Sequence, residues 1–270
     1  MENLGIVIFF SFVGGIFSLI GGFLLIVNEK RATKTAAYAT SFAAGALLAA
    51  AFLDLLKEAA HEGNVEVALL STLIGILFFF LLERFLTWFH HHHEHEDSQK
   101  DPAIPLIIIG DTVHNFIDGI AIAAAFLVDV QTGIIVTLAV AAHEIPQEIG
   151  DFGLLLHKGM SRKNVIIFNI LSALATTIAA IIFYTAGQQL QLPLDVILGL
   201  VAGFFIYIAV SDIIPDIHRS EAKSFAGPQT ALLIAGVVIV GITTTYLHSF
   251  IDSQTPPPPP ESSQTTELNH

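Results

Sequence analysis

The sequence predicts an all-helical protein that crosses a membrane several times. Of its 270 residues, 53% are hydrophobic and only 13% are charged, and the mean hydropathy is +0.71. A soluble domain carries about 25% charged residues. The apolar residues occur in long runs, each near the roughly 20 residues that a membrane-spanning helix requires and too long for strands. The predicted fold is a polytopic bundle of eight transmembrane helices.

Eight apolar stretches can be distinguished, and each is predicted to form one helix. In chain order they comprise residues 4–27, 36–56, 65–89, 103–128, 133–156, 165–186, 192–214 and 229–250. The first stretch lacks a basic segment before it and a small-residue cleavage site, so we interpret it as a retained helix and not as a signal peptide. Residues 1–252 are the predicted transmembrane domain.

The basic residues predict how the bundle lies in the membrane. Ten of the 11 Lys and Arg residues fall in or beside connections on one side, and only Lys57 falls on the other. Cytoplasmic loops carry an excess of Lys and Arg, so that side is predicted to be cytoplasmic. Both termini are then expected on the non-cytoplasmic side of a cell membrane.

Two polar segments lie outside the predicted helices. Residues 90–101 form a predicted cytoplasmic loop with five histidines, which resembles a labile metal-binding tract or is simply solvated. Residues 253–270 contain five consecutive prolines and are predicted to be a disordered tail. The net charge of −13 argues against nucleic acid as a partner. The chain has no Cys, which excludes disulfides and thiolate metal sites.

The fourth stretch contains a string of polar residues at helical spacing. His114 and Asp118 are four residues apart, and Asn115 and Asp118 are three apart, so all three lie on neighbouring rows of one helix face. Asp111 lies three residues before His114 on the same side. Gly119 follows the string, and a glycine at this position is predicted to allow a close approach of another helix.

The fifth stretch repeats this arrangement. His143 is paired by spacing with Gln147, and Glu144 with Glu148. Pro146 removes a helical hydrogen bond and is predicted to bend the helix, which suits the lining of a cavity. Gly110 in the fourth stretch and Gly150 in this one are, like Gly119, predicted to lie at close helix contacts.

The chemistry of the two strings favours a metal site. An ionisable side chain at bilayer depth costs at least about 2.5–3.5 kcal/mol, so it tends to face a partner, a cavity or an ion. Imidazole, carboxylate and amide groups without sulfur fit a divalent first-row ion such as zinc, iron or manganese. A single Asn can instead serve as an interhelical hydrogen bond. Asp111, Glu148 and Asp151 are either ligands or groups that orient the histidines.

Charged residues near two helix ends have two interpretations. Asp54, Glu58 and His61 share helical spacing at the outer end of the second stretch and either form an entrance funnel for cations or an ordinary solvated helix end. Asp212 and Asp216, near the cytoplasmic end of the seventh stretch, either line an exit or are solvated.

The two polar strings resemble motifs of the ZIP family of zinc/iron-type metal transporters. His114-Asn115-x-x-Asp118-Gly119 is similar to the family's HNxxDG motif. Residues 143–151, His-Glu-x-Pro-x-Glu-x-Gly-Asp, are similar to the HExPHExGD motif of one subfamily, with Gln147 where that subfamily usually has His. The His-rich loop, the eight-span layout and the outward termini agree with this resemblance.

The resemblance implies a binuclear metal site between the fourth and fifth helices. The implied ligands of the main position are His114, Asp118, His143 and Gln147. Those of the neighbouring position are Asn115, Asp118 and Glu144, with Glu148 as a further candidate. It also implies metal movement into the cytoplasm by one helix bundle sliding against another, and a homodimer.

The sequence therefore favours a secondary transporter of zinc, with iron, manganese and cadmium as further candidate cargoes, that needs no cofactor and is not an enzyme. One alternative is a metal–proton antiporter that exports divalent cations, although such proteins typically have fewer spans and a sizeable cytoplasmic domain. Another is an intramembrane metalloprotease, which would need His-Glu-x-x-His on one helix. Here Gln147 stands at the second His position and Pro146 lies inside the motif.

Overall fold

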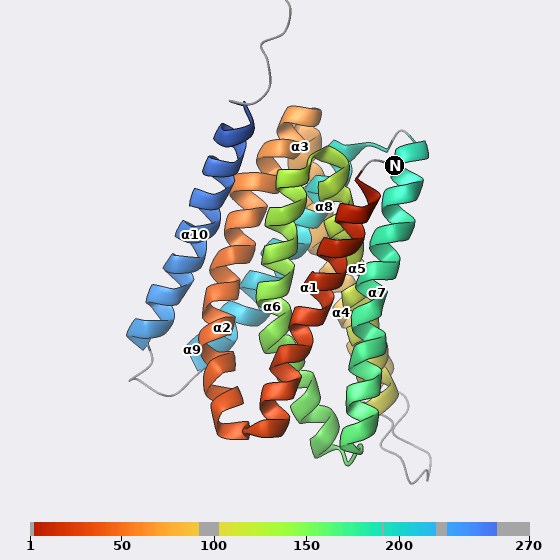
Figure 1. The fold of residues 1–270 in the computed structure, drawn as a ribbon, viewed down its shortest axis with the longest axis vertical. Helices are drawn as coiled ribbons and strands as arrows, with labels where there is room; N and C mark the ends of the chain where they lie inside the picture. Colours follow the sequence, from red (N-terminus) through yellow and green to blue (C-terminus); the bar gives the residue numbers. More distant parts are fainter. Residues whose placement is uncertain (1–2, 92–102, 191, 220–225, 253–270) are drawn as a thin grey trace, which may run out of the picture.

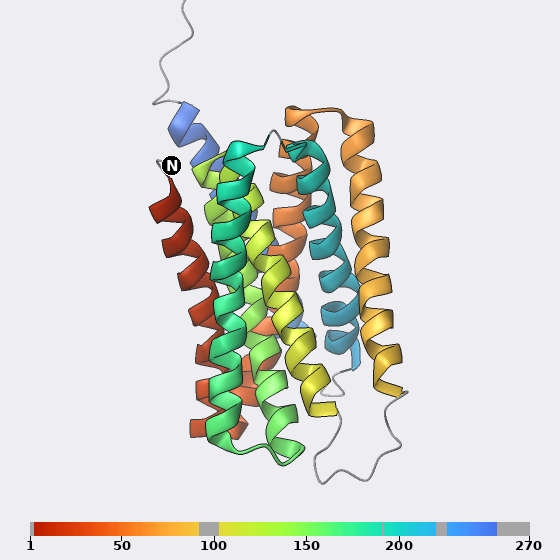
Figure 2. The same ribbon diagram turned by 90° about the vertical axis from the view of Figure 1, so that its right-hand side faces the viewer.

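A computed structural model describes residues 3–91, 103–190, 192–219 and 226–252, and the regular structure within these ranges is entirely helical (Figure 1). The helices run along the long axis of an elongated bundle, as the view turned by 90° also shows (Figure 2). In chain order the elements are α1 (Leu4–Val27), α2 (Glu29–Ala49), η1 (Ala50–Leu55), α3 (Leu56–Glu62), α4 (Val65–His91), α5 (Ala103–Val128), α6 (Val130–His157), α7 (Arg162–Gln189), α8 (Leu194–Tyr207), η2 (Ile208–Ile213), α9 (Ile214–Arg219) and α10 (Ala226–Asp252).

Each predicted stretch is helical, and two of the predicted boundaries are confirmed at both ends, those of α1 and α5. The other helices extend beyond their apolar stretches by up to seven residues, except that α8 begins at Leu194, two residues after the predicted start. α4 includes His90 and His91, which we predicted to be loop, because no Gly or Pro interrupts the sequence before Pro102. The rest of the predicted His-rich loop and the predicted tail 253–270 lie outside the described residues.

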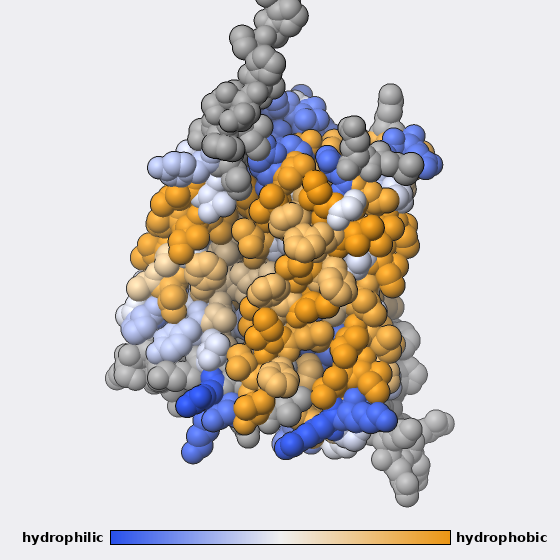
Figure 3. Space-filling view, viewed as in Figure 1, coloured by the Kyte–Doolittle hydropathy of each residue, from blue (hydrophilic) through white to orange (hydrophobic). Residues whose placement is uncertain are grey.

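The surface and the helix lengths are those of a polytopic membrane protein. Seven helical spans among the described residues are long and apolar enough to cross a membrane. α6 is also 28 residues long, but His143, Glu144, Glu148 and Asp151 lower its hydropathy. Figure 3 shows apolar side chains over the middle of the bundle and hydrophilic ones at both ends. The start of α1 and the end of α10 lie at the same end (Figure 1).

Two spans contain a π-helical segment that the sequence analysis did not predict. η1 joins α2 to α3 and contains Asp54, and η2 joins α8 to α9 and contains Asp212. η1 packs against α8, and η2 packs against α2. A π-helical turn accommodates an additional residue within a continuing helix and is frequent at functional sites. Asp54 and Asp212 therefore lie within helices that continue beyond them as α3 and α9.

The helices form two groups. In one group, α1, α5, α6 and α7 pack together; in the other, α2–η1–α3, α4, α8–η2–α9 and α10 pack together. Contact between the groups is made mainly by α2 against α6. α2 has a buried face rich in small residues, namely Ala43, Ala44, Ala46 and Ala49, which Ala50 and Ala51 continue in η1. We call these the α5–α6 group and the α2–α8 group.

Gly119 brings α5 into direct contact with α7, as its sequence context predicts. A Cβ atom at this position would overlap the carbonyl oxygen of Thr176 and lie 2.8 Å from the Cβ of Ala179. The same prediction is wrong for Gly110 and Gly150, because a Cβ atom at either would meet nothing within 4 Å. These two glycines line a cavity instead.

The replacement Gly119→Ala should lower the stability of the bundle. The added methyl group must push α5 away from the α7 backbone, and overpacking of this kind costs about 1–3 kcal/mol, against at most about 1 kcal/mol gained from helix propensity. Thermal unfolding of the protein in detergent micelles measures the effect. Gly110→Ala, in the same helix, is the matched control and should keep or raise the melting temperature; an equal loss in both variants would contradict the assigned contact.

Candidate metal site

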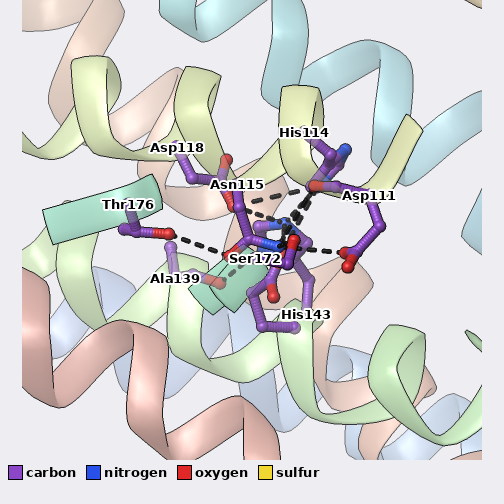
Figure 4. A network of polar contacts seen from close by, with 9 residues as sticks. Asp111, His114, Asn115, Asp118, Ala139, His143, Ser172 and Thr176 are labelled. Atoms are coloured by element: carbon purple, nitrogen blue, oxygen red, sulfur yellow. Dashed lines mark hydrogen bonds and ion pairs between the residues drawn. The ribbon is translucent and has the colours of Figure 1, made fainter. Parts of the chain in front are cut away.

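The polar strings of α5 and α6 meet at the middle of the α5–α6 group. Ligand atoms of His114, Asp118, His143 and Glu144 all lie within 4.8 Å of one another. Helix geometry explains the convergence, since His114 and Asp118 are one turn apart on α5 while His143 and Glu144 are adjacent on α6. The close-up shows the α5 side chains and His143 pointing toward one another (Figure 4). We call these four residues the His/Asp/Glu cluster.

The two imidazoles are in direct contact. Nε2 of His114 lies 3.1 Å from Nε2 of His143. Oδ2 of Asp118 lies 3.3 Å from the His143 nitrogen and 3.7 Å from that of His114. Oε1 of Glu144 lies 3.6 Å from Nε2 of His114 and 3.9 Å from Nε2 of His143. Both carboxylates therefore face both imidazole nitrogens, as an ion between the helices would require.

The backbone of α6 orients His143. Its Nδ1 lies 3.1 Å from the carbonyl oxygen of Ala139, one turn earlier. When Nδ1 donates its hydrogen to this carbonyl, Nε2 carries a lone pair directed at the cluster. Metal-binding histidines are commonly fixed in this way, with the second ring nitrogen bonded to a carbonyl or carboxylate.

The carboxylates of the cluster are buried and short of hydrogen-bond donors. Asp118 is 2% exposed and Glu144 is 1% exposed. Oδ2 of Asp118 and both carboxylate oxygens of Glu144 accept no hydrogen bond from any described residue. Buried polar atoms are normally satisfied, and an isolated buried carboxylate is costly. A cation between the imidazoles and the carboxylates would satisfy these oxygens.

Asn115 points to the side of the cluster, where α7 holds it. Its side-chain amide donates to Oδ1 of Asp111 at 3.0 Å and to the hydroxyl of Ser172 at 3.3 Å. Its carbonyl oxygen accepts from the hydroxyl of Thr176 at 2.8 Å (Figure 4). The amide is fully buried, so these bonds link α5 to α7 directly beside the two histidines.

Sequence reasoning missed the contribution of α7. Asn169, Ser172 and Thr176 are each 1% exposed and follow one another at spacings of three and four residues. Buried polar residues at this spacing indicate a helix face directed at other polar groups. That signal was present in the sequence, within an otherwise apolar stretch.

The two remaining predicted site residues have different surroundings. Gln147 lines a cavity together with His114 and His143. Glu148 is fully buried and belongs neither to the His/Asp/Glu cluster nor to the lining of that cavity.

The cavity extends from the two histidines toward one end of the bundle. Its volume is about 700 Å³, and its polar lining includes Glu83, Asp111, Asp151 and Asp212. No residue of α5 after Ile117 and no residue of α6 before His143 lines it. Those parts of α5 and α6 are largely buried core, such as Ile122 and Val136. The cavity therefore leads to the end where α4 finishes and α5 begins.

Aromatic rings of the α2–α8 group face both histidines. The ring of Phe79 on α4 meets that of His114 edge to face with centroids 6.0 Å apart, and Phe205 on α8 lies 6.3 Å from His143. Phe79 also stacks against Tyr207 at 5.4 Å. The hydroxyl of Tyr207 donates to Oε2 of Glu83 at 2.6 Å. These rings form the wall opposite α5 and α6.

The predicted entrance funnel is divided in two. Glu58, His61 and Glu62 bring their ligand atoms within 4.8 Å of one another at the end of α3, where His61 and Glu62 are exposed. Asp54 is 1% exposed within η1 and is not part of this group. At the opposite end of the bundle, Asp212 lines the cavity, while the side chain of Asp216 lies outside what the structure describes.

Comparison with known proteins decides the family. A family model described as "ZIP Zinc transporter" matches residues 4–106 and 103–244, which is nearly the whole helical part of the chain. The chain belongs to the ZIP zinc transporter family. The resemblance of residues 114–119 and 143–151 to ZIP motifs is thereby confirmed.

Several ZIP proteins are similar to this chain. The zinc transporter ZIP10 of Danio rerio is 40% identical over 132 residues, covering 47% of this chain and 16% of that protein. The zinc transporter ZIP13 of Pongo abelii is 32% identical over 215 residues, covering 74% and 64%. The metal cation symporter ZIP14 of Xenopus tropicalis is 35% identical over 149 residues, covering 52% and 32%. The matched part of this chain spans less than two thirds of each of these ZIP relatives.

Thr176→Val should destabilise this ZIP protein through Asn115. Valine has the shape of threonine but cannot donate to the Asn115 carbonyl, and a buried acceptor left unsatisfied costs about 1–3 kcal/mol. Thr176→Ser keeps the hydroxyl and should lose much less. Thermal unfolding in micelles compares the two, with Thr185→Val as a control on the same helix, since that hydroxyl bonds to the backbone of its own helix. Equal losses for Val at 176 and at 185 would contradict the role of the Asn115 bond.

Proposed function

We propose that this ZIP family protein is a secondary transporter that carries zinc across a cell membrane into the cytoplasm. The observation that carries the proposal is the His/Asp/Glu cluster, in which two imidazoles and two carboxylates converge within a membrane-spanning bundle. Its nitrogen and oxygen donors, without sulfur, suit a first-row divalent ion that must also be released. A structural zinc site would more typically be closed by Cys and His.

The site is proposed to hold two ions. Asp118 is the bridging ligand, because its carboxylate faces both histidines. His114, His143 and Gln147 complete the first position, and Gln147 approaches it from the cavity side. Asn115 and Glu144 complete the second position. For Asn115 to bind metal, its carbonyl oxygen must accept the ion in place of the Thr176 hydroxyl. Glu148 is a further candidate that lies one turn from Glu144.

The cavity and the basic residues support the proposed direction of transport. The cavity leads from the cluster to the end of the bundle that contains Lys30, Arg84, Lys158 and Arg162. Positive residues mark the cytoplasmic side, so the structure is proposed to be open inward, with eight spans and both termini outside. Zinc would then leave through the cavity lined by Asp111 and Asp151.

The packing of glycines supports a movement of one helix group against the other. Within the described residues, each glycine at which a Cβ atom would overlap a neighbouring helix meets a helix of its own group. Gly15 meets Ala173 in the α5–α6 group, whereas Gly75 meets Leu200 and Gly236 meets Phe42 in the α2–α8 group. Backbone contacts therefore hold each group together internally. The interface of α2 with α6 lacks such interlocked contacts among these residues, and we propose that it slides.

Two other functions are weaker. An exporter that exchanges metal for protons would use similar ligands, but the cavity and the basic residues point to inward release. A metalloprotease would need a second histidine one turn after His143, where Gln147 stands. A homodimer and the transport of iron, manganese or cadmium remain part of the proposal as further properties of the same protein.

Replacing the cluster should abolish zinc uptake. Radiolabelled zinc is added outside proteoliposomes that contain the protein, and the initial rate of zinc uptake is measured. His143→Ala and Asp118→Ala should each lower this rate at least about tenfold, because even the loss of a group that only orients a metal ligand costs about 10–100-fold in metal affinity or activity. His157→Ala, an exposed histidine at the end of the same helix, should leave the rate unchanged. Wild-type rates in the two cluster variants would refute the site, and a lower zinc content in intact cells that express the protein than in cells that do not would refute the direction.

Gln147→His should shift the cargo preference toward zinc. An added imidazole on the cavity side raises the affinity for zinc more than that for manganese, which prefers oxygen ligands. The measurement is competition of unlabelled zinc, iron, manganese and cadmium against labelled zinc uptake, for the variant and the wild type in parallel. Gln188→His, on α7 outside the site, is the matched control. An unchanged ratio of zinc to manganese inhibition would place residue 147 outside the metal's coordination.

A further inference from the structure

A second cavity, separate from the metal site, lies where the turn between α6 and α7 meets the start of α5. Its volume is about 580 Å³. Its apolar lining comes from Ile104, Pro105, Ile108, Ile109, Met160 and Phe168. None of these residues lines the cavity that leads from the histidines. Ile109 is 51% exposed and Pro105 is also exposed, so the apolar wall continues onto the outer surface of the bundle. We call this cavity the α5–α7 groove.

The turn that closes one end of the groove has a fixed conformation. Gly159 has φ +86°, which side chains other than glycine rarely adopt, and it ends α6. The amide of Met160 donates to the carbonyl of Leu155 at 3.1 Å, and that of Gly159 donates to Leu156 at 3.0 Å. This is a Schellman motif. Met160 packs onto a small core cluster that includes Leu155 and Ile104, so the rim of the groove is held in place.

The rim carries positive charge. Lys158 precedes Gly159, and Arg162 and Lys163 are exposed in the first turn of α7. The Ser161 side chain accepts from the amide of Asn164, and the Ser161 carbonyl accepts from Val165. The backbone amides of Arg162 and Lys163 lie in the first turn of α7, where a helix has no carbonyl for them to bond. The start of the helix therefore adds partial positive charge. The residues that line the groove include no acidic side chain.

We infer that the α5–α7 groove binds one anionic phospholipid of the membrane leaflet at this end of the bundle. The apolar wall faces the hydrocarbon and accommodates part of an acyl chain. The phosphate lies at the start of α7 beside Arg162 and Lys163. This position is where the apolar span of α7 begins, which is the depth at which headgroups lie. Basic residues near a membrane surface attract anionic lipids by about 1 kcal/mol each.

The two features of the groove select one occupant. A free phosphate would use the cations but not the apolar wall. A zwitterionic lipid such as phosphatidylcholine would use the wall but gain less from the cations, because its choline group opposes the charge of its phosphate. α5 and α6 also carry the His/Asp/Glu cluster, and α7 bonds to Asn115 beside it, so the lipid binds the helix group that holds the proposed metal site. The inference does not depend on the proposed transport activity, because lipid binding can be measured directly.

The test is lipid binding to the full chain by native mass spectrometry. The protein, in detergent micelles, is titrated with phosphatidylglycerol and, separately, with phosphatidylcholine. One phosphatidylglycerol should bind with higher affinity than phosphatidylcholine. In Arg162→Gln/Lys163→Gln the affinity for phosphatidylglycerol should fall about 25-fold, that is, about fivefold for each cation removed, while the affinity for phosphatidylcholine falls much less.

Two further variants separate the groove from general surface charge. Lys30→Gln/Arg31→Gln removes two exposed cations from the first turn of α2 at the same end of the bundle, where Asn28 caps the helix as Ser161 caps α7. This control should retain phosphatidylglycerol binding. Ile109→Trp fills the groove without changing charge and should lower that binding. The inference is overturned by an equal loss in the control, by unchanged binding in Ile109→Trp, or by equal affinities of the wild type for both lipids.

Discussion

The structure depends on offsetting the free-energy cost of burying the imidazole and carboxylate groups of the His/Asp/Glu cluster away from water. Within the bundle, Asp118 and Glu144 present three carboxylate oxygens that no described donor satisfies, and His143 is buried beside them. Hydrocarbon and apolar core offer these groups no hydrogen bonds. Only the two imidazole nitrogens and a cation between them can offset the cost. An ion bound as proposed would thus also help to make the site tolerable in a membrane.

The two helix groups contact the His/Asp/Glu cluster in different ways: the α5–α6 group fixes its side chains, and the α2–α8 group only packs against them. Gly119 allows α5 to touch α7, and the Thr176 hydroxyl fixes Asn115 from the same helix. The backbone of α6 orients His143. All of these contacts lie within the α5–α6 group. The α2–α8 group faces the histidines with the rings of Phe79 and Phe205, which can slide past without breaking a hydrogen bond. A movement between the groups would therefore change access to the metal and leave its ligands together.

Residues whose burial is costly were predicted from the sequence, whereas polar residues that are cheaper to bury gave a weaker signal and were missed. His114 and His143 are conspicuous in apolar stretches. Helical spacing predicted a polar face on each helix, and the family resemblance implied that the two faces meet. Ser172 and Thr176 are less informative, because a hydroxyl in a helix usually bonds to the carbonyl four residues earlier. Thr185 does so on the same helix, and Thr176 does not. The π-helical segments at Asp54 and Asp212 depend on tertiary packing, and the apolar pattern around them is that of an ordinary helix.

Gly110 and Gly150, which we wrongly predicted to lie at helix contacts, occupy equivalent positions on the two helices of the site. A glycine in a membrane helix allows either a close helix contact or an open space, and sequence alone does not separate the two. Gly110-Asp111 precedes the histidine of α5, and Gly150-Asp151 follows that of α6. Because the two helices run in opposite directions, both Gly-Asp pairs lie on the same side of the cluster and line the same cavity. The glycines leave room for an ion with its water, and the carboxylates offer it oxygen ligands. In the proposed function, each motif thus supplies both a ligand for the ion and, about one or two turns away, part of the path along which the ion would leave.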